Sequence, residues 1–280
     1  MIVLSHYQAG PLLEARRRGE AVAVASPDLN LTTVEVILEE GGVLFPCGER
    51  LSWEQVEQIA GAENKCFLVE EGGIREIRTF SEVTGWVRSL FPTRRAPTML
   101  VSGLTMHRIE GVDPYEDTHR KIKAARPAGH VLDTATGLGY TAIEAARLAE
   151  HVVTVELDPA SLEIARLNPW SWELFDNPKI EQIIGDVWDV VEEMDDQRFS
   201  CIIHDPPAFR LAGDLYSGDF YRELYRVLKR RGRLFHYIGD PQSRSVQRVM
   251  RGVARRLQEA GFSRVVHRPE AFGLVAYKQR

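Results

Sequence analysis

The sequence has few cysteines, no long apolar run and no large excess of charge, and each shortage excludes a class of protein. The three cysteines among its 280 residues, Cys47, Cys66 and Cys201, are too few and too widely spaced for a disulfide framework or a zinc cluster. No apolar run approaches the roughly 18–20 residues that a membrane helix needs. Residues 1–20 carry their charges after a short apolar segment, which is unlike a signal peptide. We therefore expect a cytoplasmic protein with reduced thiols, no membrane contact and no metal site.

The charges of the chain are unevenly distributed. Hydrophobic residues make up 44% of the sequence and charged residues 27%, as in an ordinary folded protein. The net charge of −5 combines −4 over residues 1–95, −12 over 96–221 and +11 over 222–280. A basic end on an otherwise acidic chain predicts a local contact with a polyanion.

Two regions differ in their patterns. Residues 1–92 mix short strand-like runs with one or two helices, which predicts a small α+β accessory domain that could bind substrate. Ser52 and Gln55 form a capping box at the start of one of these helices. Prolines among polar residues then predict a linker over 93–112.

Residues 113–280 alternate strands and helices. Strands are expected at 130–134, 152–156, 180–184, 201–204 and 233–238, followed by a closing hairpin at 263–268 and 273–278. Helices are expected at 113–126, 141–149, 159–167, 219–229 and 245–260. This alternation predicts an α/β domain with a doubly wound, mostly parallel seven-stranded sheet.

The turn after the first of these strands suits a nucleoside-bearing ligand. Asp133 ends the strand, and the small residues Ala135, Gly137 and Gly139 allow a ligand to approach the backbone closely. Glu156 ends the next strand, where its carboxylate can accept hydrogen bonds from both ribose hydroxyls. The alternative interpretation is a tight turn that binds nothing.

Two ligand classes fit this turn. Gly137, Gly139 and Ala142 match the G-x-G-x-x-A pattern of dinucleotide-binding folds, which leaves an NAD-dependent oxidoreductase open. Read from Asp133, the segment resembles motif I of class I S-adenosylmethionine-dependent methyltransferases, with Ala135 in place of the usual first glycine.

A second segment favours the methyltransferase. Asp186 and Val187 follow the strand at 180–184 and resemble the family position where an acid meets the adenine amino group and an apolar neighbour covers the ring. The resemblance implies a Rossmann-like fold and S-adenosyl-L-methionine as cofactor, with Thr118 or Asp117 in the preceding helix covering its methionine end. The alternative for this helix is a capped surface helix. The implied cofactor-binding residues are Thr118, Asp133, Ala135, Gly137, Gly139, Glu156, Leu157, Asp186 and Val187.

The strongest motif is the segment 201–209, whose last five residues read Asp-Pro-Pro-Ala-Phe. Two prolines cannot continue a central strand, so they fix the backbone after Asp205. The segment resembles the D-P-P-aromatic motif of methyltransferases that act on nucleic-acid amines. With the aromatic residue one place later, it is similar to the D-P-P-x-F form of some ribosomal RNA methyltransferases, including predicted archaeal ones.

These residue types suit methyl transfer to an exocyclic base amine. Such an amine is a poor nucleophile because its lone pair is delocalised into the ring, and acceptors for its N–H groups favour the reactive pyramidal form. The Asp205 carboxylate and the Pro206 carbonyl can supply two acceptors, which Pro206 and Pro207 hold rigidly. Phe209 can stack on a base that has left its helix or loop. No metal or covalent intermediate is needed.

The basic end predicts an RNA partner. Arg244, Arg248, Arg251 and Arg255 are spaced to form one stripe on a helix, as contacts to successive phosphates require. The alternative is a solvated helix face. We therefore predict an S-adenosylmethionine-dependent N-methyltransferase of ribosomal RNA, with cytidine N4 favoured. The alternatives are a small-molecule methyl- or aminopropyltransferase, an NAD-dependent oxidoreductase and a non-catalytic RNA-binding protein.

Overall fold

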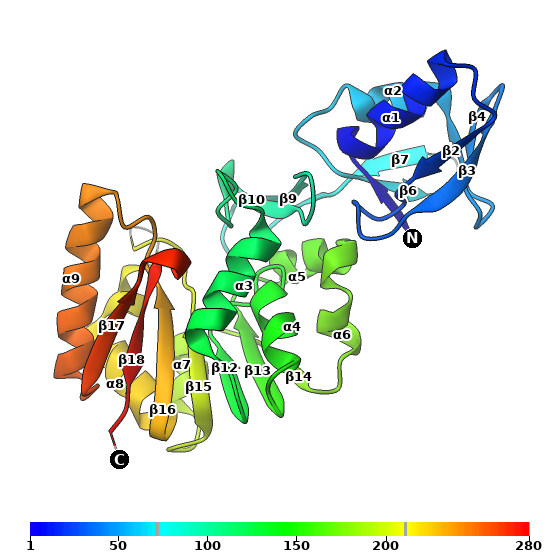
Figure 1. The fold of residues 1–280 in the computed structure, drawn as a ribbon. Coiled ribbons are helices and arrows are strands. Elements are labelled where there is room, and N and C mark those ends of the chain that lie inside the picture. The colour runs from blue at the N-terminus through cyan, green and yellow to red at the C-terminus, as the bar shows by residue number, and fades with distance from the viewer. Residues whose placement is uncertain (71–72, 210–211, 280) are drawn as a thin grey trace. The chain divides into compact units, whose positions relative to one another are not determined.

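The computed structural model describes residues 1–70, 73–209 and 212–279, and these form two compact units. The first unit comprises Met1–Tyr115 and Ala160–Trp172, and the second comprises Glu116–Pro159 and Glu173–Arg280 (Figure 1). The first unit therefore extends past the predicted domain boundary at residue 92. It also includes Ala160–Trp172, which lies in sequence between two strands of the second unit.

In the described residues of the first unit, the strands form three small antiparallel sheets. One sheet consists of β1 (Ile2–Leu4), β6 (Phe67–Glu70) and β7 (Gly73–Glu76), and another of β2 (Val22–Ala25), β3 (Val34–Glu39), β4 (Gly42–Leu44) and β5 (Arg50–Ser52). The helices α1 (His6–Arg17) and α2 (Trp53–Ala60) pack on each other, and α5 (Pro159–Arg166) lies almost wholly in this unit. The predicted capping box of Ser52 and Gln55 is confirmed at the start of α2.

The third sheet changes the interpretation of the predicted linker. It consists of β8 (Arg78–Phe80), β9 (Val87–Phe91), β10 (Thr98–Val101) and β11 (Leu104–Thr105). The segment 93–112 thus contains two paired strands and is not a simple connection. Strands of four and two residues are too short to show a clear alternation in sequence, so the prolines dominate the pattern.

The second unit is built on a seven-stranded sheet, as predicted. Its strand order is β14-β13-β12-β15-β16-β18-β17, and β18 is antiparallel to both of its neighbours while the other adjacent pairs are parallel. The strands are β12 (His130–Asp133), β13 (His151–Glu156), β14 (Ile180–Ile184), β15 (Phe199–His204), β16 (Leu228–Tyr237), β17 (Arg264–Arg268) and β18 (Gly273–Tyr277). The helices are α3 (Pro114–Ala125), α4 (Tyr140–Ala146), α6 (Glu173–Asp176), α7 (Val187–Glu192), α8 (Gly218–Val227) and α9 (Arg244–Glu259) (Figure 1).

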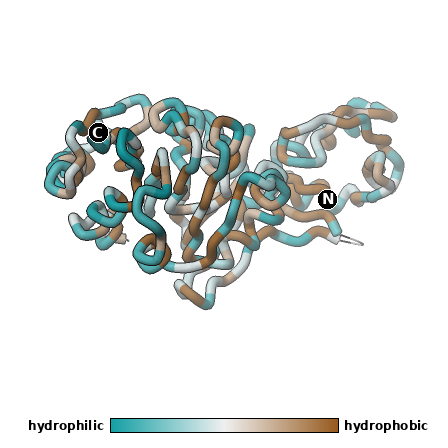
Figure 2. Tube along the Cα trace, turned by 90° about the horizontal axis from the view of Figure 1, so that it is seen from below, coloured by the Kyte–Doolittle hydropathy of each residue, from teal (hydrophilic) through white to brown (hydrophobic). Residues whose placement is uncertain are grey.

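Apolar side chains alternate between the two faces of this sheet. Leu132 and Ile202 face a core that α7, α8 and α9 cover with residues such as Phe220 and Leu257. Cys201, one position away, contacts α3, where its Sγ lies 3.6 Å from the Ala125 carbonyl oxygen. In Figure 2 apolar residues follow these strands, and hydrophilic residues are frequent in the segments around them. Helices on both faces make the sheet doubly wound.

The junction between α8 and β16 differs from the prediction. The helix ends at Val227 instead of residue 229, and β16 begins at Leu228 instead of residue 233. Leu228 pairs with Phe199 and Arg233 with Cys201, so the segment between them bulges out of the ladder. Arg231 takes a left-handed φ of 62° in this bulge. An inserted bulge leaves no periodic signal, so the sequence pattern could not reveal it.

Candidate active site

Three predicted acidic residues meet at the carboxyl edge of the sheet. Asp133 ends β12, Glu156 ends β13, and Asp205 directly follows β15. The strand order reverses between β12 and β15, because successive strands are added on opposite sides of β12. Ligands of doubly wound sheets bind at this kind of switch point, outside the carboxyl ends of the strands. The candidate active site therefore lies here.

The loop from β12 to α4 requires its glycines. Gly137 and Gly139 have left-handed φ values of 53° and 78°. A side chain at Gly139 would place its Cβ 2.6 Å from Leu174 Cδ2. The loop is also tied to β13, because the Gly137 N–H donates to Glu156 Oε2 at 2.8 Å. Glu156 Oε1 accepts from the Asp158 N–H at 3.0 Å, so both carboxylate oxygens are oriented by the backbone.

Asp133 is buried beneath this loop. Its Oδ2 accepts hydrogen bonds from Thr154 Oγ1 at 3.0 Å and Thr141 Oγ1 at 3.1 Å. Burial, opposed by these two hydroxyls, raises the pKa of Asp133 to about 7. Its Oδ1 has no hydrogen-bond partner among the residues that the structure describes. A buried acceptor of this kind fits a ligand that brings a donor or a positive charge.

Asp205 is paired with a lysine that the sequence analysis missed. Lys121 Nζ lies 2.6 Å from Asp205 Oδ2 and 3.1 Å from Asp117 Oδ2, and the Lys121 side chain is only 3% exposed. The Nζ atom also lies 4.3 Å from the ring centroid of Tyr237. Burial opposes ionisation of Lys121, but the carboxylates of Asp205 and Asp117 outweigh it and raise its pKa, so it remains an ammonium. The i, i+4 spacing of Asp117 and Lys121 predicts only their own pairing on one face of α3, and not the contact with Asp205.

The Asp205 carboxyl group experiences two opposing effects. Burial raises the pKa of Asp205, and the ammonium of Lys121 acts against this shift. The Asp205 side chain is 19% exposed, so solvent or substrate can reach it. A lysine-paired carboxylate with a raised pKa can accept a hydrogen bond and then a proton.

The residues around the two prolines are fixed by side-chain hydrogen bonds. Pro206 is buried and Pro207 exposed, and the Tyr216 hydroxyl donates to the Pro207 carbonyl oxygen at 3.1 Å. His204, just before Asp205, lies 2.7 Å from Thr134 Oγ1 through Nδ1 and 2.9 Å from the Leu215 carbonyl oxygen through Nε2. Because a carbonyl only accepts, Nε2 carries the proton and Nδ1 accepts from Thr134.

His204 is therefore a structural residue. Burial lowers the pKa of His204 to about 4, so the ring stays neutral near pH 7. Cys201 is equally inert, because burial raises its pKa to about 12. Neither the histidine nor this cysteine is placed to react. In the part of the chain that the structure describes, no three His, Cys, Asp or Glu side chains gather to hold a metal.

The aromatic residue of the motif is half exposed. The Phe209 side chain is 47% exposed and packs edge-on against Tyr216, with ring centroids 5.3 Å apart. Residues 210–211 lie outside the described part of the chain. A half-exposed ring beside the Asp-Pro-Pro segment is suited to stacking with a planar group.

The predicted adenine-binding residues differ in their exposure to solvent. Asp186 is exposed and caps α7 by accepting from the Trp188 N–H at 2.8 Å. Val187 packs in the core, whereas Leu157 and Ile184, which was not predicted, are 50% and 58% exposed. The exposed apolar pair is thus better placed than Val187 to cover a ring.

Thr118 and Ala135 lie close to the site in the fold. Thr118 is buried on α3, in the same helix as Lys121. Ala135 is partly exposed in the loop between Asp133 and Gly137.

The four predicted stripe arginines are exposed on α9, and they are Arg244, Arg248, Arg251 and Arg255. Arg255 lies 3.6 Å from Glu259. The neighbouring Arg256 instead turns inward and donates to the Tyr216 carbonyl oxygen at 2.8 Å. The amphipathic helix thus presents a basic outer face.

Comparison with known proteins agrees with this geometry. Residues 119–263 match the methyltransferase small domain family, and this region contains Lys121, Asp133, Glu156 and Asp205. The chain belongs to this family. Membership supports methyl transfer that depends on S-adenosylmethionine, and it favours the motif I interpretation of the glycine loop over the dinucleotide one.

The chain is also similar to individual proteins. It is 43% identical over 239 residues to the uncharacterized protein MJ1233 of Methanocaldococcus jannaschii, covering 84% of this chain and 81% of that protein. A shorter stretch of 87 residues is 32% identical to the polyamine aminopropyltransferase of Aeropyrum pernix and covers 28% of that enzyme.

Solved structures share the fold. Spermidine synthase from Thermotoga maritima superimposes with a TM-score of 0.57 at 18% identity, covering 76% of this chain and 78% of that one. A spermidine synthase in complex with the transition-state analogue AdoDATO gives a TM-score of 0.56 at 18% identity, covering 73% of this chain and 75% of that one.

Among the described residues, no helix is long and apolar enough to cross a membrane.

Proposed function

We propose that this protein transfers a methyl group from S-adenosylmethionine to an amine nitrogen, and that the amine is the exocyclic amine of an RNA base. The observation that carries the proposal is the Asp205 carboxylate, held 2.6 Å from the buried Lys121 ammonium and followed by two prolines at the switch point of the sheet. An ionised, partly exposed and rigidly held acceptor is what amine activation requires.

The cofactor fits the residues present. The buried Asp133 Oδ1, which has no partner among the described residues, suits the ammonium of the methionine moiety. Glu156, oriented by two backbone N–H groups, suits the ribose hydroxyls, and Leu157 and Ile184 offer apolar surface for the adenine. When bound, S-adenosylmethionine supplies an electrophilic methyl group on a sulfonium.

The chain's own residues prepare the nucleophile. Lys121 donates to Asp205 Oδ2 and favours the ionised carboxylate, while Oδ1 accepts an N–H of the amine. The Pro206 carbonyl accepts the second N–H, which would free the nitrogen lone pair from the ring to form the new nitrogen–carbon bond as the carbon–sulfur bond of the sulfonium breaks and S-adenosylhomocysteine leaves. The product nitrogen then gives up a proton, which Asp205 can take because burial raises its pKa.

The proposed RNA substrate rests on two surfaces. The exposed Phe209 ring can stack on a base drawn out of its helix or loop, with cytidine N4 as the favoured position. The exposed arginine stripe of α9 can contact backbone phosphates. Ribosomal RNA is the expected target because the Asp-Pro-Pro-x-Phe form resembles that of enzymes that modify it.

Aminopropyl transfer is a second candidate, and the similarity to polyamine aminopropyltransferase and to spermidine synthases favours it. Here too an amine nitrogen attacks a carbon bound to a sulfonium, so Asp205 would have the same role. The donor would be decarboxylated S-adenosylmethionine and the acceptor an aliphatic diamine.

A donor-by-acceptor experiment tests the proposal. The full chain is incubated with S-adenosylmethionine or its decarboxylated form, and with RNA from cells lacking the protein or with putrescine and spermidine, and the products are identified by mass spectrometry. We expect base N-methylation from S-adenosylmethionine alone, abolished in Asp205→Asn. An aminopropylated polyamine as the only product would establish the second candidate, and no product in any arm would contradict both.

A further inference from the structure

A basic pocket lies at the amino edge of the sheet in the second unit, opposite the candidate active site. Its volume is about 170 Å³, which is enough for a phosphate group. Its cationic lining residues are Arg126, Lys229, Arg230, Arg231 and Arg233, and the rest of its lining comes from Ala128, Ser200, Cys201 and Gly232. No carboxylate is among these lining residues.

The fold brings these cations together from three places. Arg126 directly follows α3 and precedes β12, while Arg233 lies in β16, paired with Cys201 at the start of the regular part of β15. Between Leu228 and Arg233 the bulge of β16 presents Lys229, Arg230 and Arg231 in succession. Gly232 closes the bulge so tightly that a Cβ there would lie 2.7 Å from Leu228 Cγ.

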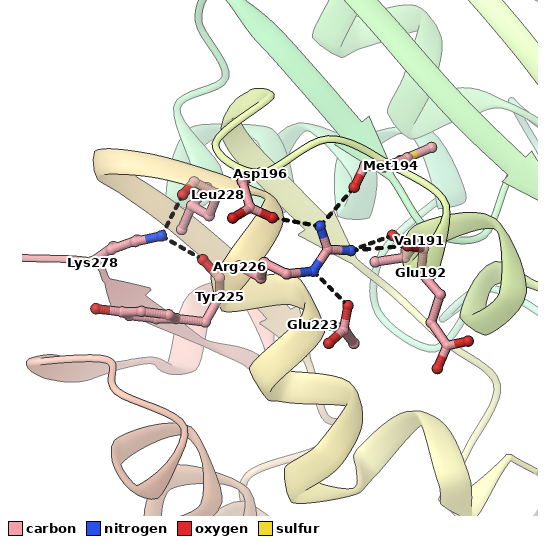
Figure 3. Close-up of polar contacts among 9 residues, drawn as sticks. All are labelled: Val191, Glu192, Met194, Asp196, Glu223, Tyr225, Arg226, Leu228 and Lys278. Atoms are coloured by element: carbon pink, nitrogen blue, oxygen red, sulfur yellow. Dashed lines mark hydrogen bonds and ion pairs between the residues drawn. The ribbon is translucent and has the colours of Figure 1, made fainter.

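Two neighbouring cations on this edge are bound within the fold by carbonyl or carboxylate oxygens, whereas the pocket cations are not. Figure 3 shows Arg226 donating to the carbonyl oxygens of Val191, Glu192 and Met194, and pairing with Asp196 and Glu223. It also shows Lys278 donating to the carbonyl oxygens of Tyr225 and Leu228, each at 2.7 Å.

By contrast, Lys229, Arg230, Arg231 and Arg233 form no ion pair with any residue that the structure describes, and neither does Arg126. The side chains of Lys229, Arg230 and Arg231 are exposed, and that of Arg233 is partly exposed. Five like charges around one cavity repel one another unless an anion joins them.

We propose that this pocket binds a phosphate group, carried either by an RNA backbone or by a free nucleotide. Guanidinium groups pair with phosphate oxygens through two parallel N–H donors, which makes a cluster of arginines selective for this chemistry. The site lies one strand length from Asp205, about 17–20 Å for a typical strand, so it is separate from the catalytic edge. The proposal does not depend on the identity of the reaction.

The experiment measures binding of inorganic pyrophosphate and of a short labelled single-stranded RNA to the full chain, without cofactor. The pocket variant is Lys229→Ala with Arg230→Ala. The control is Arg78→Ala with Arg94→Ala, two exposed arginines of the first unit, which removes the same charge. Arg230→Lys keeps the charge but loses the two parallel N–H donors, so it is expected to bind less tightly than the wild type and more tightly than the pocket variant. Thermal melting verifies that every variant is folded.

We expect pyrophosphate to bind the wild type and the control and to bind the pocket variant poorly. If the source is an RNA backbone, the pocket variant also loses RNA affinity about 25-fold at 0.1 M salt, and its salt slope becomes shallower by about 1.4. Unchanged RNA binding together with lost pyrophosphate binding identifies a free nucleotide as the source. Equal pyrophosphate affinity in the pocket variant and the wild type, or none in the wild type, would overturn the proposal.

Discussion

Replacing Lys121 with methionine tests the electrostatics of the site. The substitution keeps most of the side-chain volume but leaves Asp117 and Asp205 without the ammonium that lies 3.1 Å and 2.6 Å from them. Removing one partner of a buried pair costs about 3–5 kcal/mol, because the remaining charge is buried and uncompensated. We expect Lys121→Met to lose stability in this range at pH 8.

The loss is expected to depend on pH. Without Lys121, the pKa of Asp205, already raised by burial, rises further, and that of Asp133 follows in the same direction. A carboxyl group whose pKa is higher in the folded state binds more protons there, so stability falls as pH rises towards that pKa. Each affected group can change stability by up to about 1.4 kcal/mol per pH unit in this window. The deficit relative to wild type is therefore larger at pH 8 than at pH 5.

Urea unfolding at pH 5 and pH 8 measures both effects. Lys123→Met, an exposed lysine on the same helix, serves as the control and is expected to change stability by less than about 0.5 kcal/mol at either pH. A deficit for Lys121→Met below about 1 kcal/mol, or one that is the same at both pH values, would refute the reasoning.

Four further predictions concern ligands and activity. Glu156→Ala weakens S-adenosylmethionine binding roughly tenfold to a hundredfold by calorimetry, since a charge-assisted hydrogen bond contributes about 1.5–3 kcal/mol; an unchanged Kd in a folded variant rejects the ribose role. Asp205→Ala abolishes transfer while cofactor affinity is retained, and near-normal turnover excludes amine activation. Because the pKa of Asp133 is about 7, cofactor affinity falls as pH drops below 7, by at most about tenfold per unit, and Asp133→Asn removes this dependence. Arg248→Ala with Arg251→Ala makes the salt slope of RNA binding shallower by about 1.4 for any RNA sequence, and an unchanged slope identifies a solvated helix face.

Much of the second unit could be predicted because its signals are local. Each buried strand is a short apolar run, and the acids Asp133, Glu156 and Asp205 stand where those runs end. Since parallel strands finish at one edge of a sheet, their positions in sequence were enough to place all three at that edge. The closing antiparallel hairpin was predicted from its two consecutive strand-like runs, at 263–268 and 273–278.

The parts that were missed depend on long-range contacts or on irregular backbone. Lys121 meets Asp205 across 84 residues of sequence, and a lysine in an ordinary helix carries no sign of such a partner. The bulge of β16 lacks a periodic pattern, so Lys229 was predicted to end a helix and residues 230–232 were assigned to no element. The strands at Thr98–Val101 and Leu104–Thr105 are too short to outweigh the prolines that suggested a linker.

Mass spectrometry of nucleosides from the total RNA of cells with and without this protein tests the central claim most directly. The account predicts that one nucleoside methylated on an exocyclic nitrogen disappears with the protein, and that expression of the wild type restores it while the Asp205→Ala variant does not. Loss of a nucleoside methylated on carbon or on the ribose, or an unchanged nucleoside profile, would contradict the account.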